Sequence, residues 1–371
     1  MGTRFLDSRL HIRQNRVTAD EISFVRAKLQ TRFGLAIAQR SDRTQPITAS
    51  NIFNIARLNK IANFLGDISA DESGEPFAQE LSSLVRDYRQ RTIALNSATL
   101  QTMRRAVEAL DDTGVEFMLF KGPLQQHLLY ESCFAKPSGD VDILVYARHF
   151  DRARDALAEI GFSIETRSKS LWWRLFLGEQ HLVRPEPRAT IDLHHRLQQP
   201  GSPSPLAMRA FFDRRQRVEL AGASVPSLSL HDVALVAAIS VTKALFNREP
   251  SGGYVCDLHA SLTQVPDSEI DVFVAEAERQ GLLPTLLFGV RTVDALLGAS
   301  SQLSDRAQRI LPDIPGSAIL EFVITPWQAT SRWPRRRAVL WELCDKKIGR
   351  YVSESAWASL SEIGRRLFYV R

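Results

Sequence analysis

The sequence contains little cysteine and no long apolar run. Its 371 residues include three cysteines, Cys133, Cys256 and Cys344, which lie far apart and have no CxxC or CxxH companion. This spacing suits neither a disulfide framework nor a zinc site, so we expect reduced thiols in packed positions. No stretch approaches the roughly 18 to 20 apolar residues of a membrane helix, and the first residues are too charged for a secretion signal. We therefore expect a cytoplasmic protein with no transmembrane segment.

The sequence also lacks a large excess of charge. Lys and Arg number 47 and Asp and Glu number 42, which gives a net charge of +5. This balance favours an anionic partner such as a nucleotide, but it is too small to indicate general DNA or RNA binding. Two Arg-rich stretches, 332–347 and 364–371, are typical of solvated helix surfaces. Their alternative role is to bind an acidic protein, a membrane surface or a nucleic-acid acceptor.

Hydrophobic periodicity divides the chain into three parts. Residues 1–98 have a helical period and almost no strand signal, so we expect a helical N-terminal region. Residues 99–200 alternate between short apolar strands and helices, which predicts a small mixed sheet. Residues 198–208 contain three prolines and read as a linker, after which 201–371 is expected to be a helical C-terminal domain. The predicted fold class is α+β, with helical segments on both sides of the core.

Individual elements follow from the same patterns. Period-2 or continuous apolar runs predict strands at 115–120, 141–147, 162–168, 179–187 and 188–197. Apolar residues at helical spacing predict helices at 19–39, 83–114, 123–132, 149–161, 229–246, 253–264, 268–281 and 284–298.

Two aspartates lie at the start of the apolar strand predicted at 141–147. Side chains two apart share one face of a strand, so Asp140 and Asp142 point the same way. Two adjacent carboxylates repel each other, and a divalent cation between them relieves the repulsion. Asp192 has the same setting in strand 188–197, so three carboxylates converge if the two strands are neighbours. Oxygen ligands without a thiolate favour Mg²⁺ or Mn²⁺ over zinc.

Each of these residues also has a structural interpretation. Asp140 and Asp142 can cap backbone amides of the turn-rich segment KPSGD, and Asp192 can pair with an arginine. The apolar character of the strand after Asp140 favours the metal site instead. His194 shares a strand face with Asp192, so it is either a structural histidine or a residue that holds Asp192 in place.

The turn before the aspartates has the features of a phosphate site. Gly122 lets the backbone approach a ligand closely, and Pro123 suits the first turn of a helix, where its missing N–H is not needed. The free amides at this helix start attract anions, and Lys121 adds a positive charge. A magnesium nucleoside triphosphate fits both this turn and the aspartates.

Three motifs in order carry a family resemblance. They are FMLFKGPLQQHLLY at 117–130, KPSGDVDILV at 136–145 and ATIDLHHRL at 189–197. Together they resemble an uncharacterised nucleotidyltransferase family of the DNA polymerase β-like superfamily. The likeness spans roughly residues 95–300 and includes later signatures around Lys243 and Asp257. Both residues lie on predicted helices, where we expect each of them to form an ion pair at the edge of the core.

The resemblance implies a two-metal mechanism. Asp140 and Asp142 would ligate both ions, and Asp192 would complete the site of the ion that activates the acceptor. The reaction would transfer a nucleoside monophosphate from a nucleoside triphosphate to a hydroxyl or phosphate acceptor and release pyrophosphate. A peptide, a saccharide, another small molecule or a nucleic-acid end could be the acceptor.

The phosphate turn departs from the wider superfamily. The usual Gly-Ser is replaced by Gly122-Pro123, although the related family shares the Lys-Gly form. The alternative function is therefore a catalytically silent nucleotide-binding protein of the same fold, with a regulatory or interaction role. The residues expected to bind the nucleotide are Lys121, Gly122, Lys136, Ser138 and Gly139.

Overall fold

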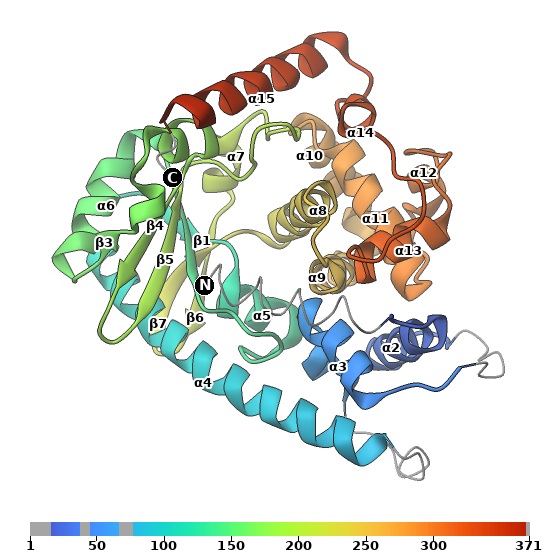
Figure 1. Ribbon diagram of the computed structural model, residues 1–371. Coiled ribbons are helices and arrows are strands. Elements are labelled where there is room, and N and C mark those ends of the chain that lie inside the picture. Colours follow the sequence, from blue (N-terminus) through green and yellow to red (C-terminus); the bar gives the residue numbers. More distant parts are fainter. Residues whose placement is uncertain (1–15, 38–44, 67–76, 369–371) are drawn as a thin grey trace.

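The computed structural model describes residues 16–37, 45–66 and 77–368, so the predicted helical region 1–98 is described only in part. A mixed β-sheet occupies one side of the molecule, and the helices of the C-terminal half gather on the other side (Figure 1). This arrangement of one mixed sheet and many helices confirms the predicted α+β fold class.

The described residues form one seven-stranded sheet with the order β3-β4-β5-β2-β1-β7-β6. Strand β2 is antiparallel to β1 and parallel to β5. Four of the five predicted strands are confirmed, whereas the one expected at 162–168 has only two strand residues. The strands are β1 Phe117–Leu119, β2 Val141–Val145, β3 Ser163–Ile164, β4 Glu179–Arg184, β5 Ala189–His194, β6 Gln216–Leu220 and β7 Ala223–Ser227.

Strands β6 and β7 correct the sequence prediction, which has only helices after residue 208. They form a hairpin whose two-residue turn, Ala221 and Gly222, has φ values of 53° and 75°. This is the primed turn that suits the twist of a hairpin, but Ala-Gly is a weaker signal than Asn-Gly. Pro226 inside β7 also disfavours a strand, because proline has no N–H to donate to a neighbouring strand. Because β7 pairs with β1, the sheet extends beyond the predicted boundary at residue 200; the three-part division stays a prediction.

The predicted helices are present in the described part of the chain. The helix expected at 19–39 ends earlier, at Arg32, and residues 38 and 39 lie outside the described chain. The helices are α2 Ala19–Arg32, α3 Ala49–Leu58, α4 Ala78–Asp111, α5 Gly122–Tyr130, α6 Phe150–Glu159, α7 Met208–Asp213, α8 Leu230–Phe246, α9 Gly252–Leu262, α10 Ile270–Arg279, α11 Leu283–Leu297, α12 Ser304–Ala307, α13 Gly316–Ile324, α14 Arg336–Leu343 and α15 Ile348–Phe368.

The alternation along β2 assigns its two faces to two hydrophobic cores. Ile143 and its neighbours two residues away pack with α4 and α6. Leu144 belongs instead to the larger core, which joins α2 and α3 to the C-terminal helices. Asp142 shares the face of Leu144. The carboxylate therefore lies on the side of the sheet that faces the helical bundle.

The N-terminal helices pack directly on the C-terminal ones. Gln30 of α2 donates a hydrogen bond to the carbonyl of Leu297 at 2.9 Å, and Arg26 donates to Leu296 at 2.8 Å. These bonds join the start of the described chain to the end of α11, so the two helical regions are parts of one packed body.

Two expectations from composition can be compared with the structure. No helix among the described residues is long and apolar enough to cross a membrane. The three cysteines are free, and Cys256 and Cys344 are buried while Cys133 is half-buried.

Candidate active site

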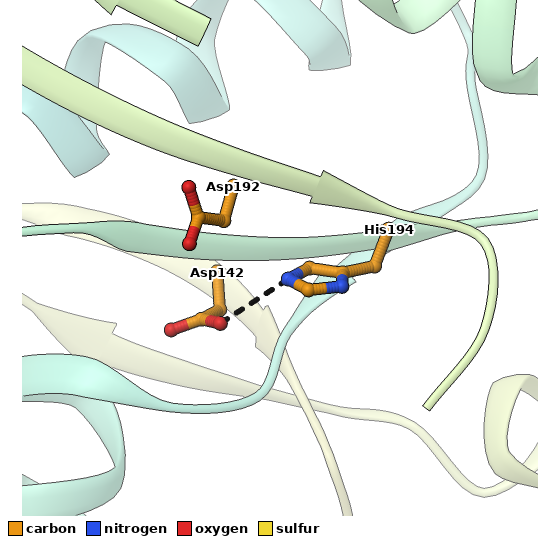
Figure 2. A group of neighbouring side chains, drawn as sticks. All are labelled: Asp142, Asp192 and His194. Carbon is orange, nitrogen blue, oxygen red and sulfur yellow. Dashed lines mark ion pairs between the residues drawn. The ribbon is translucent and has the colours of Figure 1, made fainter. Parts of the chain in front are cut away.

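Two aspartates meet across neighbouring strands. Asp142 of β2 stands opposite Asp192 of β5 in the parallel register, and both side chains are buried. Figure 2 shows their carboxylates close together with the ring of His194 beside them. One ligand atom from each of these three residues lies within 4.8 Å of the other two. The predicted neighbourhood of the two strands is confirmed.

Asp140 lies at a bend just before β2 and is half-buried. Its carboxylate is outside the three-residue group, but it is close enough for the charges of Asp142 and Asp192 to change its pKa. Burial and the negative charges of Asp142 and Asp192 raise the pKa of Asp140 to about 6. A cation placed near these residues would favour the charged form of Asp140. Its role as a metal ligand stays a proposal.

Of the two roles expected for His194, the contacts favour a structural histidine over a residue that holds Asp192. Its Nε2 lies 3.3 Å from Asp142 Oδ1, and its Nδ1 lies 3.4 Å from Glu179 Oε2. The residue that holds Asp192 is His181 of β4, with Nδ1 2.5 Å from Asp192 Oδ1. Burial lowers the pKa of His181, but the hydrogen bond and the charge of Asp192 outweigh it and raise the pKa to about 9.

Strand geometry explains why Asp192 contacts His181 rather than His194. Residues two apart on one strand are about 6.5 to 7 Å apart, whereas residues directly opposite across an antiparallel pair are about 4.5 to 5.5 Å apart. In the β4–β5 pair, His181 stands opposite Asp192, and Glu179 stands opposite His194. The cross-strand neighbours therefore make the contacts.

Lys121 compensates the charge of Asp142. Its Nζ lies 3.6 Å from Asp142 Oδ1. Burial raises the pKa of Asp142, but the positive charge of Lys121 and the contact with His194 outweigh it and hold the pKa well below its usual range. Lys121 is the N-cap of α5 and makes no side-chain capping bond, so the first amides of this helix are free of a side-chain cap.

The turn at Gly122 touches the segment that carries the aspartates. Gly122 has a φ of +72°, and a Cβ placed there would lie 3.3 Å from Ser138 Oγ and 3.4 Å from the carbonyl oxygen of Asp140. Only glycine combines this backbone conformation with so close an approach. Gly139 lies next in the segment and packs against Leu95 of α4.

The loop before β2 is fixed by residues that the sequence reading missed. Asn96 of α4 donates to the carbonyl of Lys136 at 2.7 Å and accepts from the amide of Ser138 at 2.8 Å. Thr99, one turn further along α4, donates to the carbonyl of Ser138 at 2.9 Å. The only sequence signal was a pair of polar residues three apart on a helix, which is a common surface pattern.

Lys136 is engaged by a carboxylate. Its ammonium forms a buried ion pair with Asp257 of α9, and the hydroxyl of Tyr130 donates to the other oxygen of Asp257 at 2.7 Å. The expected ion pair of Asp257 is therefore confirmed. The expected contact of Lys136 with a nucleotide stays a prediction.

The geometry fits a divalent cation. His194 Nε2 is buried and, despite its 3.3 Å distance from Asp142, lacks a partner with hydrogen-bond geometry. A buried ring nitrogen that forms no hydrogen bond, beside two carboxylates, is an arrangement that a bound ion completes. The oxygen atoms of Asp142 and Asp192 suit Mg²⁺ or Mn²⁺, and the imidazole is a further ligand for a transition metal.

Three comparisons relate the chain to known proteins. The chain is similar to a solution structure of the antibiotic-resistance factor ANT(2'')-Ia, with 9% sequence identity, a TM-score of 0.34, and coverage of 49% of this chain and 92% of that chain. No curated protein matches the chain. The model of a family described as uncharacterised nucleotidyltransferase matches residues 45–298, which include all three sequence motifs. Because this match covers most of the chain, the protein belongs to the uncharacterised nucleotidyltransferase family.

Proposed function

We propose that the protein transfers a nucleoside monophosphate from a nucleoside triphosphate to a hydroxyl or phosphate acceptor and releases pyrophosphate. The observation that carries this proposal is the register of β2 and β5, which places Asp142 opposite Asp192, with the buried Nε2 of His194 3.3 Å from Asp142 Oδ1. Family membership supports nucleotidyl transfer as the reaction class. The acceptor is proposed to be a peptide, a saccharide or another small molecule, with nucleic acid only as a terminal acceptor.

Asp142 and Asp192 would hold Mg²⁺ or Mn²⁺, with Asp140 as a further oxygen ligand. A bound divalent ion supplies Lewis-acid stabilisation of the reacting phosphate and lowers the pKa of an acceptor hydroxyl. The protein fixes the orientation of both carboxylates. His181 holds Asp192, while Lys121 and His194 hold Asp142.

The phosphate turn would bind the triphosphate through backbone and hydroxyl groups. The first amides of α5 lack a side-chain cap and are available to an anion. The hydroxyl of Ser138 forms no hydrogen bond with the described residues and lies beside Gly122. We propose that Ser138 provides the hydroxyl that the wider superfamily has directly after the turn glycine.

Labelled nucleotides test this function. The protein is incubated with Mg²⁺, a cell extract and each nucleoside triphosphate labelled at the α-phosphate, and both transfer of label and release of pyrophosphate are measured. Asp142→Asn should reduce labelling at least a hundredfold because it removes a charged ligand. Asp151→Asn is the matched control and should label normally, because Asp151 is a half-buried aspartate of α6 that pairs with Arg154 and Arg174.

Three results would contradict the proposal in different ways. Binding of triphosphate without labelling or pyrophosphate would indicate the silent nucleotide-binding protein. Transfer of label from the γ-phosphate but not from the α-phosphate would indicate a kinase-like reaction. Full activity of Asp142→Asn would show that the metal ligands are elsewhere.

A further inference from the structure

A short segment of the N-terminal region lies against the site. Asn59, which directly follows α3, accepts a hydrogen bond from the amide of Gly252 at 2.9 Å through its side chain and from the amide of Gly253 at 2.8 Å through its carbonyl. Its side-chain amide also donates to the carbonyl of Ile324 at 2.8 Å. Asn59 is buried, so these bonds fix the segment firmly at the start of α9.

The same segment contacts the loop that leads to the aspartates. Asn63, in the 3₁₀ helix η1 Ala62–Leu65, donates to the carbonyl of Phe134 at 3.2 Å. The rings of Phe64 and Tyr130 lie 5.2 Å apart. Residues 59–64 are thus held by α9 on one side and by α5 and the loop after it on the other.

Lys60 lies between these contacts. It is exposed, and its backbone has a φ of +57°, which is uncommon for a residue other than glycine. A Cβ placed on Gly253 would lie 3.5 Å from Lys60 Cβ and 3.7 Å from Lys136 Cδ, so both lysine side chains pass beside Gly253. Tyr254 raises the pKa of Lys60, burial lowers it, and the charges of Asp140 and Asp142 raise it further. Its ammonium therefore lies in the field of the site aspartates.

The charge of Lys60 is available to a ligand. Lys121 pairs with Asp142, and Lys136 pairs with Asp257. Within the described chain, the ammonium of Lys60 forms no hydrogen bond or ion pair. A triphosphate bound at the aspartates would bring several negative charges to this position, and a lysine ammonium binds phosphate oxygens as a compact charge.

We propose that Lys60 binds the phosphate groups of the nucleoside triphosphate, so that the N-terminal segment completes the active site. This inference rests on the proposed nucleotidyl transfer. The unusual backbone conformation is consistent with it, because a left-handed lysine costs stability and the surrounding contacts of Asn59 and Asn63 maintain it.

Binding measurements on matched variants test the role of Lys60. Calorimetric titration with MgATP is performed on the wild type, Lys60→Gly, Lys60→Arg and Lys346→Gly. Lys346 is a suitable control because it is also a left-handed lysine, with a φ of 55°, and follows α14, a helix that lies away from the sheet (Figure 1). Glycine relieves the strained backbone at both positions, so neither glycine variant should unfold at a lower temperature than the wild type.

We expect Lys60→Gly to weaken MgATP binding roughly tenfold or more, because a charge-assisted contact is lost. Lys60→Arg should keep most of the affinity, and Lys346→Gly should bind as the wild type does. Wild-type affinity in Lys60→Gly would overturn the role of Lys60 while leaving the proposed function intact. A wild type that binds neither MgATP nor the Mg²⁺ complex of any other nucleoside triphosphate would overturn the proposed function and, with it, this inference.

Discussion

At the scale of single residues, the site depends on which side chains face each other across neighbouring strands. Asp192 contacts His181, a residue of another strand, rather than His194, its neighbour along the same strand. His194 instead lies between Asp142 and Glu179. The two histidines therefore contact different aspartates: His181 contacts Asp192, and His194 contacts Asp142.

The backbone of Gly122 provides a prediction at this scale. Gly122→Ala should lower the free energy of unfolding by roughly 1 kcal/mol because of the positive φ, and it should also disturb Ser138 and Asp140 by steric contact. Nucleotide labelling should therefore fall strongly. Gly114→Ala is the control, since Gly114 has a φ of +67° and open space around it. Urea unfolding and the labelling assay check both variants; equal activity in the two would contradict the steric explanation.

A pH dependence follows from Asp294 of α11. Burial raises the pKa of Asp294 from 3.8 to about 6, against a smaller lowering by the hydrogen bond from Ser304. The folded state therefore binds this proton more tightly than the unfolded state does. The contribution of Asp294 to stability is largest below about pH 4 and is lost as the pH rises to about 6.

Asp294→Asn removes this titration. Compared with the wild type, the variant should gain stability progressively between about pH 4 and pH 6 and keep a constant advantage above that range. Urea unfolding of both proteins at a series of pH values measures the difference. A difference that does not change with pH would show that Asp294 titrates normally.

At the scale of elements, helix α4 positions the loop before β2. Asn96 is fully buried on this helix and bonds to Cys133, Lys136 and Ser138. Because helix α4 is rigid, its hydrogen bonds hold the loop at a fixed position relative to the sheet. This loop leads directly into β2, so its position also sets the positions of Asp140 and Asp142 at the start of the strand.

Asn96→Ala tests this support. It leaves buried backbone groups of the loop without partners and should lower the free energy of unfolding by roughly 3 kcal/mol. Metal-dependent labelling should also weaken, because the loop is released. Gln90→Ala, at an exposed position of the same helix, should change neither quantity. Chemical unfolding and a Mg²⁺ titration of activity provide the measurements, and a stable, fully active Asn96→Ala would contradict the role of α4.

At the scale of the whole molecule, the sheet and the helical bundle are joined by a buried ion pair. Lys136 belongs to the loop before β2, and Asp257 belongs to α9 of the bundle. Both side chains are buried, so removing one partner leaves an uncompensated charge. The pair therefore couples the site to the packing of the two parts.

A double-mutant cycle measures this coupling. Asp257→Ala alone should cost about 3 to 5 kcal/mol of stability, whereas adding Lys136→Met should recover part of the loss because the unpaired charge is removed. The free energies of unfolding of the two single variants and the double variant complete the cycle. Additive losses would mean that the two side chains do not interact in solution.

The amino-acid sequence by itself determined the local features of this protein. Alternation along a strand is a property of backbone geometry, so it placed Asp142 on one side of β2 and Ile143 on the other. The Lys121-Gly122 turn and the three ordered motifs were equally readable, and they identified the family before any contact was known.

Only the tertiary structure decided which distant residues meet. Register across the sheet set Asp142 opposite Asp192 and gave Asp192 the partner His181. Packing of the N-terminal helices on the C-terminal bundle fixed Asn59 and its neighbour Lys60 beside the start of α9, and the weakly marked strands β6 and β7 joined the sheet through β1. These contacts link segments far apart in the chain, and their choice depends on the combined burial and pairing of many side chains, which no local pattern contains.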